Sequence, residues 1–340
     1  MSKHFQQTDF WCDFKCAHGW NKISFNEINI LTRTFKKGPV NFSLAYIPLA
    51  PEYNSLDYSS YFECVSEFVK KLKPLLPKNT LCVRFDFPID FSDTSERDFF
   101  VKGISKYTKK LNIKKSNVDI QPPDSTYIDL FLSQDEILSS MKSKWRYNIR
   151  YASKHGVNVR RSSFADSTFQ KDLESFYNLY KITSQRDGIG IHPISYYEDL
   201  LRRGSLNNDN KVFLYIASHE DEDLAAIITL FSKDEAIYLY GCSGNNKRNL
   251  MPAYLVQWTA ICDAKEYGSK IYDFYGIPPT DDESHPMHGL YLFKTGFGGK
   301  KIHRIGSFDI PLSFAYRLYI FAENIRAFWH KKIMKKIRGR

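Results

Sequence analysis

The stretch that decides the fold is KVFLYIASHEDEDLAAIITLFSKDEAIYLYGCS, residues 211–243. Its three runs rich in β-branched and aromatic residues cover 211–218, 223–232 and 235–243. Short acidic turns at 219–223 and 233–235 join them. Strand-forming runs joined by such short turns predict an antiparallel meander.

Helical patterns flank this meander on both sides. Apolar spacing predicts helices over roughly 167–185 and 194–203, and Pro252 opens a further helix that Gly268 ends. The run KIYDFYGI then reads as a strand. A looser version of the same order comes earlier in the chain, with strands at 42–51, 80–89 and 127–132. We therefore expect an α/β (α+β) fold of two similar domains, each with a mixed, largely antiparallel sheet flanked by helices.

The expected domains cover residues 1–150 and 151–312, with a basic amphipathic helix over 313–340. The boundary between the first two falls near a single long helix at 133–156. In that helix Ser133 caps the N-terminus, Glu136 completes a capping box and Gly156 ends the last turn.

Length and composition limit the classes of protein to which this chain can belong. The chain has 340 residues, room for two ordinary domains, and no run near the ~18 apolar residues of a membrane span. Its start, MSKHFQQTDFW, lacks the apolar core of a signal peptide, so we expect a cytoplasmic protein. The six cysteines are scattered without paired metal-ligand spacing, which predicts reduced thiols and no metal site.

The net charge of +10 is concentrated at the C-terminus, where residues 311–340 hold eight Lys or Arg and one acid, Glu323. Such a tail fits an anionic partner, either nucleic acid or the phospholipid at the inner face of the cell membrane. Apolar residues at 314, 318, 321, 325 and 328 add a helical stripe. The segment 314–340 is therefore either an interfacial membrane helix or a terminal helix docked on the protein itself.

A basic ridge is expected on the 133–156 helix, because four cations recur every fourth residue: Lys142, Arg146, Arg150 and Lys154. It is either a solvated face or a surface that contacts the phosphates of RNA. Arg160 and Arg161 extend it.

Two segments could carry chemistry, since the chain has no G-x-S-x-G, H-E-x-x-H or P-loop motif. The first is the turn 240–254, which brings Arg248 to a helix N-terminus, although an ordinary strand-to-helix loop also explains it. The second is GLYLFKTGFGG, residues 289–299, with Lys294 among aromatics and glycines. Lys294 is either a surface lysine with a buried stem or a cation that stabilises an oxyanion, with glycines letting the backbone approach a ligand.

The chain resembles the FemABX family of peptidoglycan-bridge aminoacyltransferases over nearly its full length. The segments that carry the resemblance are FQQTDFWCDFKCAHGW (5–20), AYIPLAP (45–51), RFDFP (84–88), STYIDLFLSQDEILSSMKSKWRYNIRYASKHGVNV (125–159), TSQRDGIGIHPISYYEDL (183–200), GCSGNNKRNLMPAYLVQWTAICDAKEYGSKIYDFYGI (241–277) and GLYLFKTGFGGKKIHRIGSFDIPL (289–312). The family implies two domains of the acyl-CoA N-acetyltransferase type. The short spacing near residues 200–211 makes this a member without the long helical arm that some relatives carry.

The resemblance also implies roles for single residues. The family's catalytic lysine falls on Lys294, beside Phe293, and an acid of the first domain falls on Asp86. The residues that would bind substrate are Lys36 (with Lys37 as the rival), His192 in place of a common arginine, Tyr196 and Tyr240; we add Arg248 from the turn.

The reaction implied is transfer of an amino acid from aminoacyl-tRNA to an amine of the stem peptide of a nucleotide- or lipid-linked muropeptide. Aminoacyl-tRNA is the co-substrate and no separate cofactor is expected. Two alternatives stay open on the same residues: an N-acyltransferase that uses acyl-CoA, and a tRNA- or RNA-binding module in which Lys294 only contacts phosphate. The turn 240–254 lacks the R/Q-x-x-G-x-G/A pyrophosphate loop, which counts against acyl-CoA.

Overall fold

The computed structural model describes the chain except residues 1–3, 39, 54–56, 279–280 and 330–340. It forms two compact units, each considered by itself. The central unit is Asp124–Ile302 with Met1–Phe5, and the terminal unit is Gln6–Pro123 with His303–Arg340.

These units differ from the expected ranges 1–150, 151–312 and 313–340. Strand β14 (Ser307–Pro311) returns to pair antiparallel with β4 (Thr80–Asp86), so the chain after residue 302 belongs with the first 120 or so residues. The segment 124–150 belongs instead to the unit that holds the meander. A pairing between strands so far apart in sequence leaves no local pattern at either end.

The sheet of the central unit confirms the meander. From β7 onward, its strands lie in the order β7 (Asp124–Asp129), β12 (Ile271–Asp273), β11 (Glu235–Ser243), β10 (Glu222–Phe231), β9 (Lys211–His219) and β8 (Val157–Ser162). All neighbours in this series are antiparallel except β11 and β12, which are parallel.

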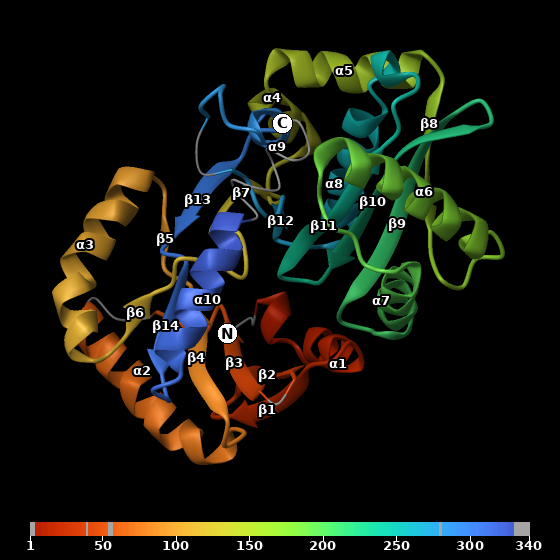
Figure 1. Ribbon diagram of the computed structural model, residues 1–340. Helices are drawn as coiled ribbons and strands as arrows, with labels where there is room; N and C mark the ends of the chain where they lie inside the picture. The colour runs from red at the N-terminus through yellow and green to blue at the C-terminus, as the bar shows by residue number, and fades with distance from the viewer. Residues whose placement is uncertain (1–3, 39, 54–56, 279–280, 330–340) are drawn as a thin grey trace. The chain divides into compact units, whose positions relative to one another are not determined.

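Helices cover both faces of this sheet (Figure 1). Helices α5 (Ser143–Lys154) and α8 (Pro252–Tyr267) pack on one face, where Tyr215 and Ala217 of β9 join their apolar core. Helices α6 (Phe169–Asp187) and α7 (Ile194–Leu206) cover the other face. Residues 188–193 join α6 to α7 and residues 207–210 join α7 to β9, so these connections have no room for a long helical arm.

The expected single helix at 133–156 is wrong, because the structure divides it into α4 (Gln134–Ser140) and α5. The capping box between Ser133 and Glu136 is present as expected. The break comes at Met141 and Lys142, whose ψ angles of 153° and 141° are not helical. The backbone N–H of Lys142 donates instead to the carbonyl of Gly296, at 2.9 Å. A partner distant in sequence therefore decides where the helix breaks.

The sheet of the terminal unit runs β1 (Asn21–Phe25), β2 (Ile28–Lys37), β3 (Val40–Pro48), β4, β14 and β6 (Lys114–Lys115). Its apolar core lies against α2 (Tyr58–Leu72) and α3 (Thr94–Lys110). The remaining helices of the described chain, from either unit, are α1 (Asp9–Ala17), α9 (His288–Thr295) and α10 (Tyr316–Phe328). Strand β5 (Asp90–Phe91) pairs with β13 (Lys300–Arg304). Short 3-10 turns cover Phe5–Gln7, Lys73–Leu75 and Arg248–Leu250.

Alternation along β4 separates two environments in the terminal unit. Val83 and Phe85 enter the apolar core, whereas Arg84 and Asp86 point to the opposite face. The Arg84 guanidinium there binds Asp309 of β14 at 2.7 Å and Glu323 of α10 at 3.0 Å. This buried ion-pair network attaches α10 to the sheet.

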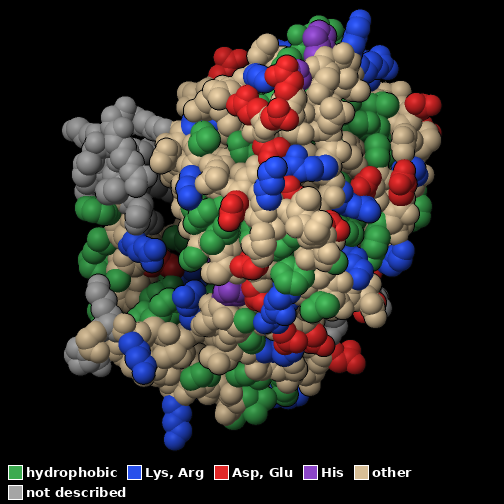
Figure 2. Space-filling model, turned by 90° about the vertical axis from the view of Figure 1, so that its right-hand side faces the viewer, with side chains coloured by type: hydrophobic (Ala, Val, Ile, Leu, Met, Phe, Trp, Pro, Cys, Tyr) green, Lys and Arg blue, Asp and Glu red, His purple; other side chains and the backbone are tan. Residues whose placement is uncertain are grey.

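No described helix is both long and apolar enough to cross a bilayer. All six cysteines are free thiols. On the face that Figure 2 shows, basic and acidic side chains are interspersed. That face therefore presents no large surface of one sign.

Candidate functional site

Lys294 is a buried lysine on α9, with only 6% of its surface exposed. Its ammonium donates to three successive backbone carbonyls: Phe274 at 2.7 Å, Tyr275 at 3.1 Å and Gly276 at 2.8 Å. An ammonium has three N–H donors, so all of them are engaged. The interpretation of Lys294 as a surface lysine is therefore wrong.

The ammonium lies where strands β11 and β12 separate. These parallel strands pair only from Glu235↔Ile271 to Ile237↔Asp273, whereas β11 pairs with β10 as far as Ser243. The Lys294 Nζ atom contacts the 274–276 carbonyls, which follow β12, and lies 5.0 Å from the centroid of the Tyr238 ring on β11. One cation thus occupies the space that opens between the two strands.

The backbone that receives Lys294 is strained. Tyr275 has a φ of 47°, in the left-handed region, which is unfavourable for a residue with a large side chain. Gly276 follows with a φ of 89°. Asp273 supports this turn by accepting from the backbone N–H of Tyr275 at 2.7 Å and from the Ser125 hydroxyl. The turn aims three carbonyls at one point, which suits a cation.

Burial lowers the pKa of Lys294 to about 7, and the negative charge of Asp273 opposes this shift. The three carbonyls also favour the charged form, because only the ammonium has three N–H donors, one for each carbonyl. Lys294 therefore gains or loses its proton near neutral pH. Residues that titrate in this range inside a site are candidates for acid–base or electrostatic roles in catalysis.

The glycines after Lys294 let the backbone approach other parts of the protein, whereas we expected them to let it approach a ligand. A Cβ at Gly296 would lie 2.2 Å from the Trp145 ring. One at Gly298 would lie 2.6 Å from the Ser140 side chain, and one at Gly299 would lie 2.3 Å from the Tyr127 carbonyl. These glycines let the segment after α9 pack against α4, α5 and β7.

Phe293 attaches α9 to Trp145 of α5 and to neighbouring aromatic side chains. Its backbone carbonyl accepts from the Trp145 indole at 2.9 Å, and its ring packs edge-on against Tyr254 and Phe297. Phe293 is thus part of the aromatic packing that holds Lys294 in place.

The structure brings three predicted substrate-binding residues together. His192, which is exposed, stacks on the Tyr196 ring with centroids 3.9 Å apart. Burial raises the pKa of Tyr240 well above its usual value, and Tyr196 and Tyr275 raise it further. Tyr240 therefore lies close both to the Tyr196 hydroxyl and to the turn that binds Lys294.

Asp86 and Lys36 belong to the terminal unit. Both Asp86 oxygens already accept hydrogen bonds, one from the Tyr46 hydroxyl and one from the Ser307 hydroxyl. Burial raises the pKa of Asp86, although both hydroxyl bonds oppose the shift. Lys36 is exposed near the end of β2, whereas the side chain of its rival, Lys37, lies outside the described residues.

The expected basic ridge is only partly exposed. The Arg146 guanidinium turns back to the carbonyls of Met141 and Ser139 and so caps the end of α4. Lys142 precedes α5 and lies over the Trp145 ring at 5.7 Å. Arg150 and Lys154 are exposed, and no acidic partner for either is found among the described residues.

An aromatic ladder on α5 was missed by the sequence analysis. Tyr147 and Tyr151 lie 5.7 Å apart between centroids, and His155 stacks on Tyr151 at 3.8 Å. These rings follow the same four-residue spacing as the cations, one position further along, so the signal was present in the sequence. The exposed rings of Tyr147 and His155, beside exposed cations, suit RNA, whose bases stack and whose phosphates are anionic.

The two arginines that were expected to extend the basic ridge are paired with acidic side chains. Arg160 binds Asp172 and Asp223, and Arg161 binds Asp263 at 3.3 Å. Arg248, by contrast, is exposed in the turn before α8, as expected for the loop at 240–254.

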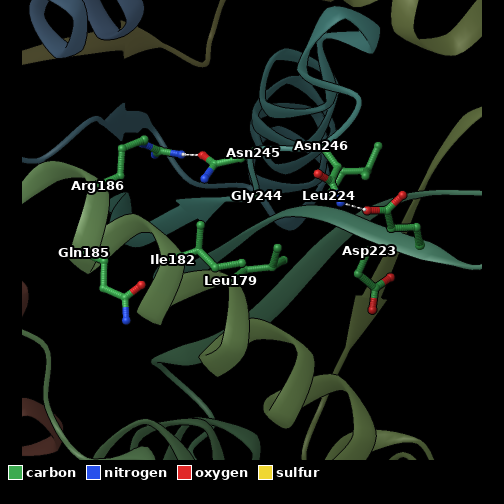
Figure 3. Close-up of a pocket in the computed structure, with 10 residues that line it drawn as sticks. Leu179, Ile182, Gln185, Arg186, Asp223, Leu224, Gly244, Asn245 and Asn246 are labelled. Atoms are coloured by element: carbon green, nitrogen blue, oxygen red, sulfur yellow. Dashed lines mark hydrogen bonds between the residues drawn. The ribbon is translucent and has the colours of Figure 1, made fainter.

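The loop after β11 borders a cavity of about 580 Å³ (Figure 3). Arg186 of α6 reaches Asn245 at 3.2 Å, and Asn246 donates to Glu222 at 2.9 Å across the same cavity. The other lining residues are Leu179, Ile182, Gln185, Asp223, Leu224 and Gly244. Polar and apolar side chains therefore both line this cavity.

A model of the FemAB family matches residues 1–218 and 206–324, so the chain belongs to the FemAB family. It is 25% identical to the lipid II:glycine glycyltransferase of Staphylococcus saprophyticus, over 93% of this chain and 89% of the relative. For the enzyme of the same name in Staphylococcus epidermidis, the values are 24%, 98% and 94%, over an alignment of 412 residues. The expectation of an aminoacyltransferase of this family is confirmed.

Comparison with solved structures confirms the expected fold class. The crystal structure of FemX matches with a TM-score of 0.73 at 20% identity, covering 93% of this chain and 94% of that one. A C-terminal domain of a lysylphosphatidylglycerol synthetase from Agrobacterium fabrum matches with a TM-score of 0.55 at 9% identity, covering 94% and 92%.

Proposed function

We propose that this protein transfers an amino acid from aminoacyl-tRNA to an amine on the stem peptide of the lipid-linked peptidoglycan precursor, and so builds the bridge between peptides. One observation carries the proposal: a lysine buried at the opening between β11 and β12, in a chain similar over nearly its whole length to glycyltransferases that act on lipid II.

The chemistry needs little from the enzyme, because the ester of aminoacyl-tRNA is already activated. The acceptor nitrogen forms a bond to the ester carbonyl carbon, the carbon–oxygen bond to the ribose breaks, and the proton lost by the amine balances the one gained by the ribose oxygen. No enzyme nucleophile is required. The absence of the usual nucleophile motifs from the sequence fits this reaction.

Lys294 is proposed to supply positive charge where the carbonyl oxygen becomes negative. Its contact with Tyr275, at 3.1 Å, is the longest of the three and is the one that a substrate oxygen would replace. The other two contacts hold the ammonium in position. Tyr240 and Tyr196, which lie near this turn, would orient the aminoacyl group.

Asp86, the first-domain acid that the resemblance implies, is poorly suited to accept the proton from the amine. Its two oxygens already hold the hydroxyls of Tyr46 and Ser307. We therefore propose that Asp86 holds together the ends of β3, β4 and β14 in the terminal unit and that a substrate group receives the proton. An Asp86→Asn variant that keeps its transfer rate would agree with this role, and a large loss in kcat alone would contradict it.

The donor is tested by charging total bacterial tRNA with labelled amino acids, one at a time, and adding purified protein with lipid-linked or nucleotide-linked muropeptide. Label that moves to a muropeptide supports the proposal and identifies both substrates. Label that moves from acetyl-CoA and never from tRNA would favour the N-acyltransferase. Salt-sensitive tRNA binding without transfer to either acceptor would favour an RNA-binding module.

A further inference from the structure

Helix α10 exposes a continuous apolar stripe. Leu318, Phe321 and Ile325 are 74%, 66% and 52% exposed and follow i, i+3, i+7 spacing, which places them on one side of the helix. Phe314, which is 95% exposed, lies two residues before the helix begins at Tyr316. An apolar surface of this kind, on a helix already attached to the protein, indicates an interaction surface.

The opposite side of α10 is firmly attached, so the stripe is not a frayed end. Glu323 binds Arg84, and the Tyr319 hydroxyl donates to Glu323 at 2.6 Å. Tyr316 is buried and donates to Asp309 at 3.0 Å. The interpretation of a docked terminal helix is therefore correct for one side of α10, whereas the other side remains exposed.

Cations border the stripe. Arg317 and Arg326 are exposed, and helical geometry places them on opposite margins of the line formed by Leu318, Phe321 and Ile325. Neither has an acidic partner among the described residues. The sequence beyond the described part, residues 330–340, adds six Lys or Arg and no acid.

We infer that α10 docks on an anionic phospholipid surface, with the stripe inserted among the acyl chains and the bordering cations at the phosphates. An amphipathic helix in the interface has this arrangement, and juxtamembrane cations strengthen it on anionic lipid. A second copy of the chain fits less well, because two such helices face to face would bring four arginines together. RNA would satisfy the cations but would leave the stripe exposed.

The inference rests on the proposed function for its purpose, because a lipid-linked acceptor lies in the same membrane, but it is tested without catalysis. The full chain is sedimented with vesicles of phosphatidylcholine alone or mixed with phosphatidylglycerol. Wild type should bind the anionic vesicles, and binding should weaken as salt rises. Leu318→Ser with Phe321→Ser should lower the partition coefficient at least about tenfold. Both residues are exposed, so the pair should fold normally.

The matched control is Phe99→Ser with Phe131→Ser, since those rings are 81% and 76% exposed elsewhere and should not affect binding. Equal binding by wild type and the α10 variant would overturn the inference. So would a wild-type dimer in solution that the α10 substitutions convert to monomers. Transfer to lipid-linked muropeptide dissolved in detergent, which offers no membrane surface, should be unchanged in the α10 variant, and this separates a failure of docking from a failure of the proposed reaction.

Discussion

The Nζ atom of Lys294 lies 2.7 Å from the carbonyl oxygen of Phe274, the residue at which β12 has left its pairing with β11. The lysine of α9 therefore supplies hydrogen bonds to a backbone that has no sheet partner on that side in the described pairing. Any catalytic role of this cation is built on a structural one, so the two must be measured separately.

Replacing Lys294 by Met should destabilise the protein. The carbonyls of residues 274–276 would lose their donor, and an unsatisfied buried carbonyl costs about 1–3 kcal/mol. Relief of the buried charge offsets part of that cost, so we expect a loss of about 2–4 kcal/mol. Urea unfolding of Lys294→Met measures it, with the exposed Lys300→Met as control. Equal midpoints for both variants would contradict the structural role.

Stability should depend on pH through Lys294. Its pKa falls from 10.5 in the unfolded chain to about 7 when folded, so between these values the unfolded state binds the extra proton. The contribution of Lys294 to the free energy of unfolding therefore rises as the pH increases from 7 to 10.5 and is lost as the pH falls through 7. Chemical unfolding across this range should show the slope in wild type and not in Lys294→Met. Parallel pH curves for the two proteins would be evidence against it.

Two glycines at the ends of α9 should respond in opposite ways to alanine. Gly296→Ala would force a methyl group against Trp145, and overpacking of this kind costs about 1–3 kcal/mol. Gly289 has open space around its Cβ position, so Gly289→Ala should be neutral or stabilise the helix by up to about 1 kcal/mol. Thermal unfolding compares them directly. Equal changes in melting temperature for the two substitutions would contradict the close packing of Gly296 against Trp145 of α5.

The two kinds of arginine on α5 should separate RNA binding from stability. Arg150→Ala should weaken tRNA binding and reduce the slope of log affinity against log salt by about 1, since an exposed phosphate contact is lost. Arg146→Ala should leave that slope unchanged and lower the melting temperature, because its guanidinium caps α4. Filter binding at several salt concentrations tests both variants. A smaller salt slope for Arg146→Ala, with no change for Arg150→Ala, would contradict these roles and support a phosphate contact by Arg146.

Local features of the sequence predicted local features of the structure well. The meander, the capping box at Ser133 and the helix between Pro252 and Gly268 all follow from neighbouring residues. The break at Met141 does not, because it depends on the carbonyl of Gly296. The discontinuous terminal unit depends likewise on β14 pairing with β4.

The candidate site shows the same division. The surrounding aromatics and glycines were enough to select Lys294, and the resemblance added its catalytic role. Its burial, however, depends on carbonyls about twenty residues earlier and on Tyr238 from another strand. The glycines do allow a close approach of the backbone, as expected, but the groups that they approach belong to the protein itself. The roles proposed for His192, Tyr196, Tyr240, Arg248 and Lys36 stay predictions.

The most direct test of the central claim is the single-turnover rate of transfer from charged tRNA at saturating muropeptide, for wild type and for folded Lys294→Met, with the acceptor Kd measured alongside. We predict that the rate falls by about 10²-fold or more, as when an oxyanion donor is lost, while the Kd changes by no more than about twofold. An unchanged rate in the folded variant would contradict a catalytic role for Lys294 and leave it as a structural cation.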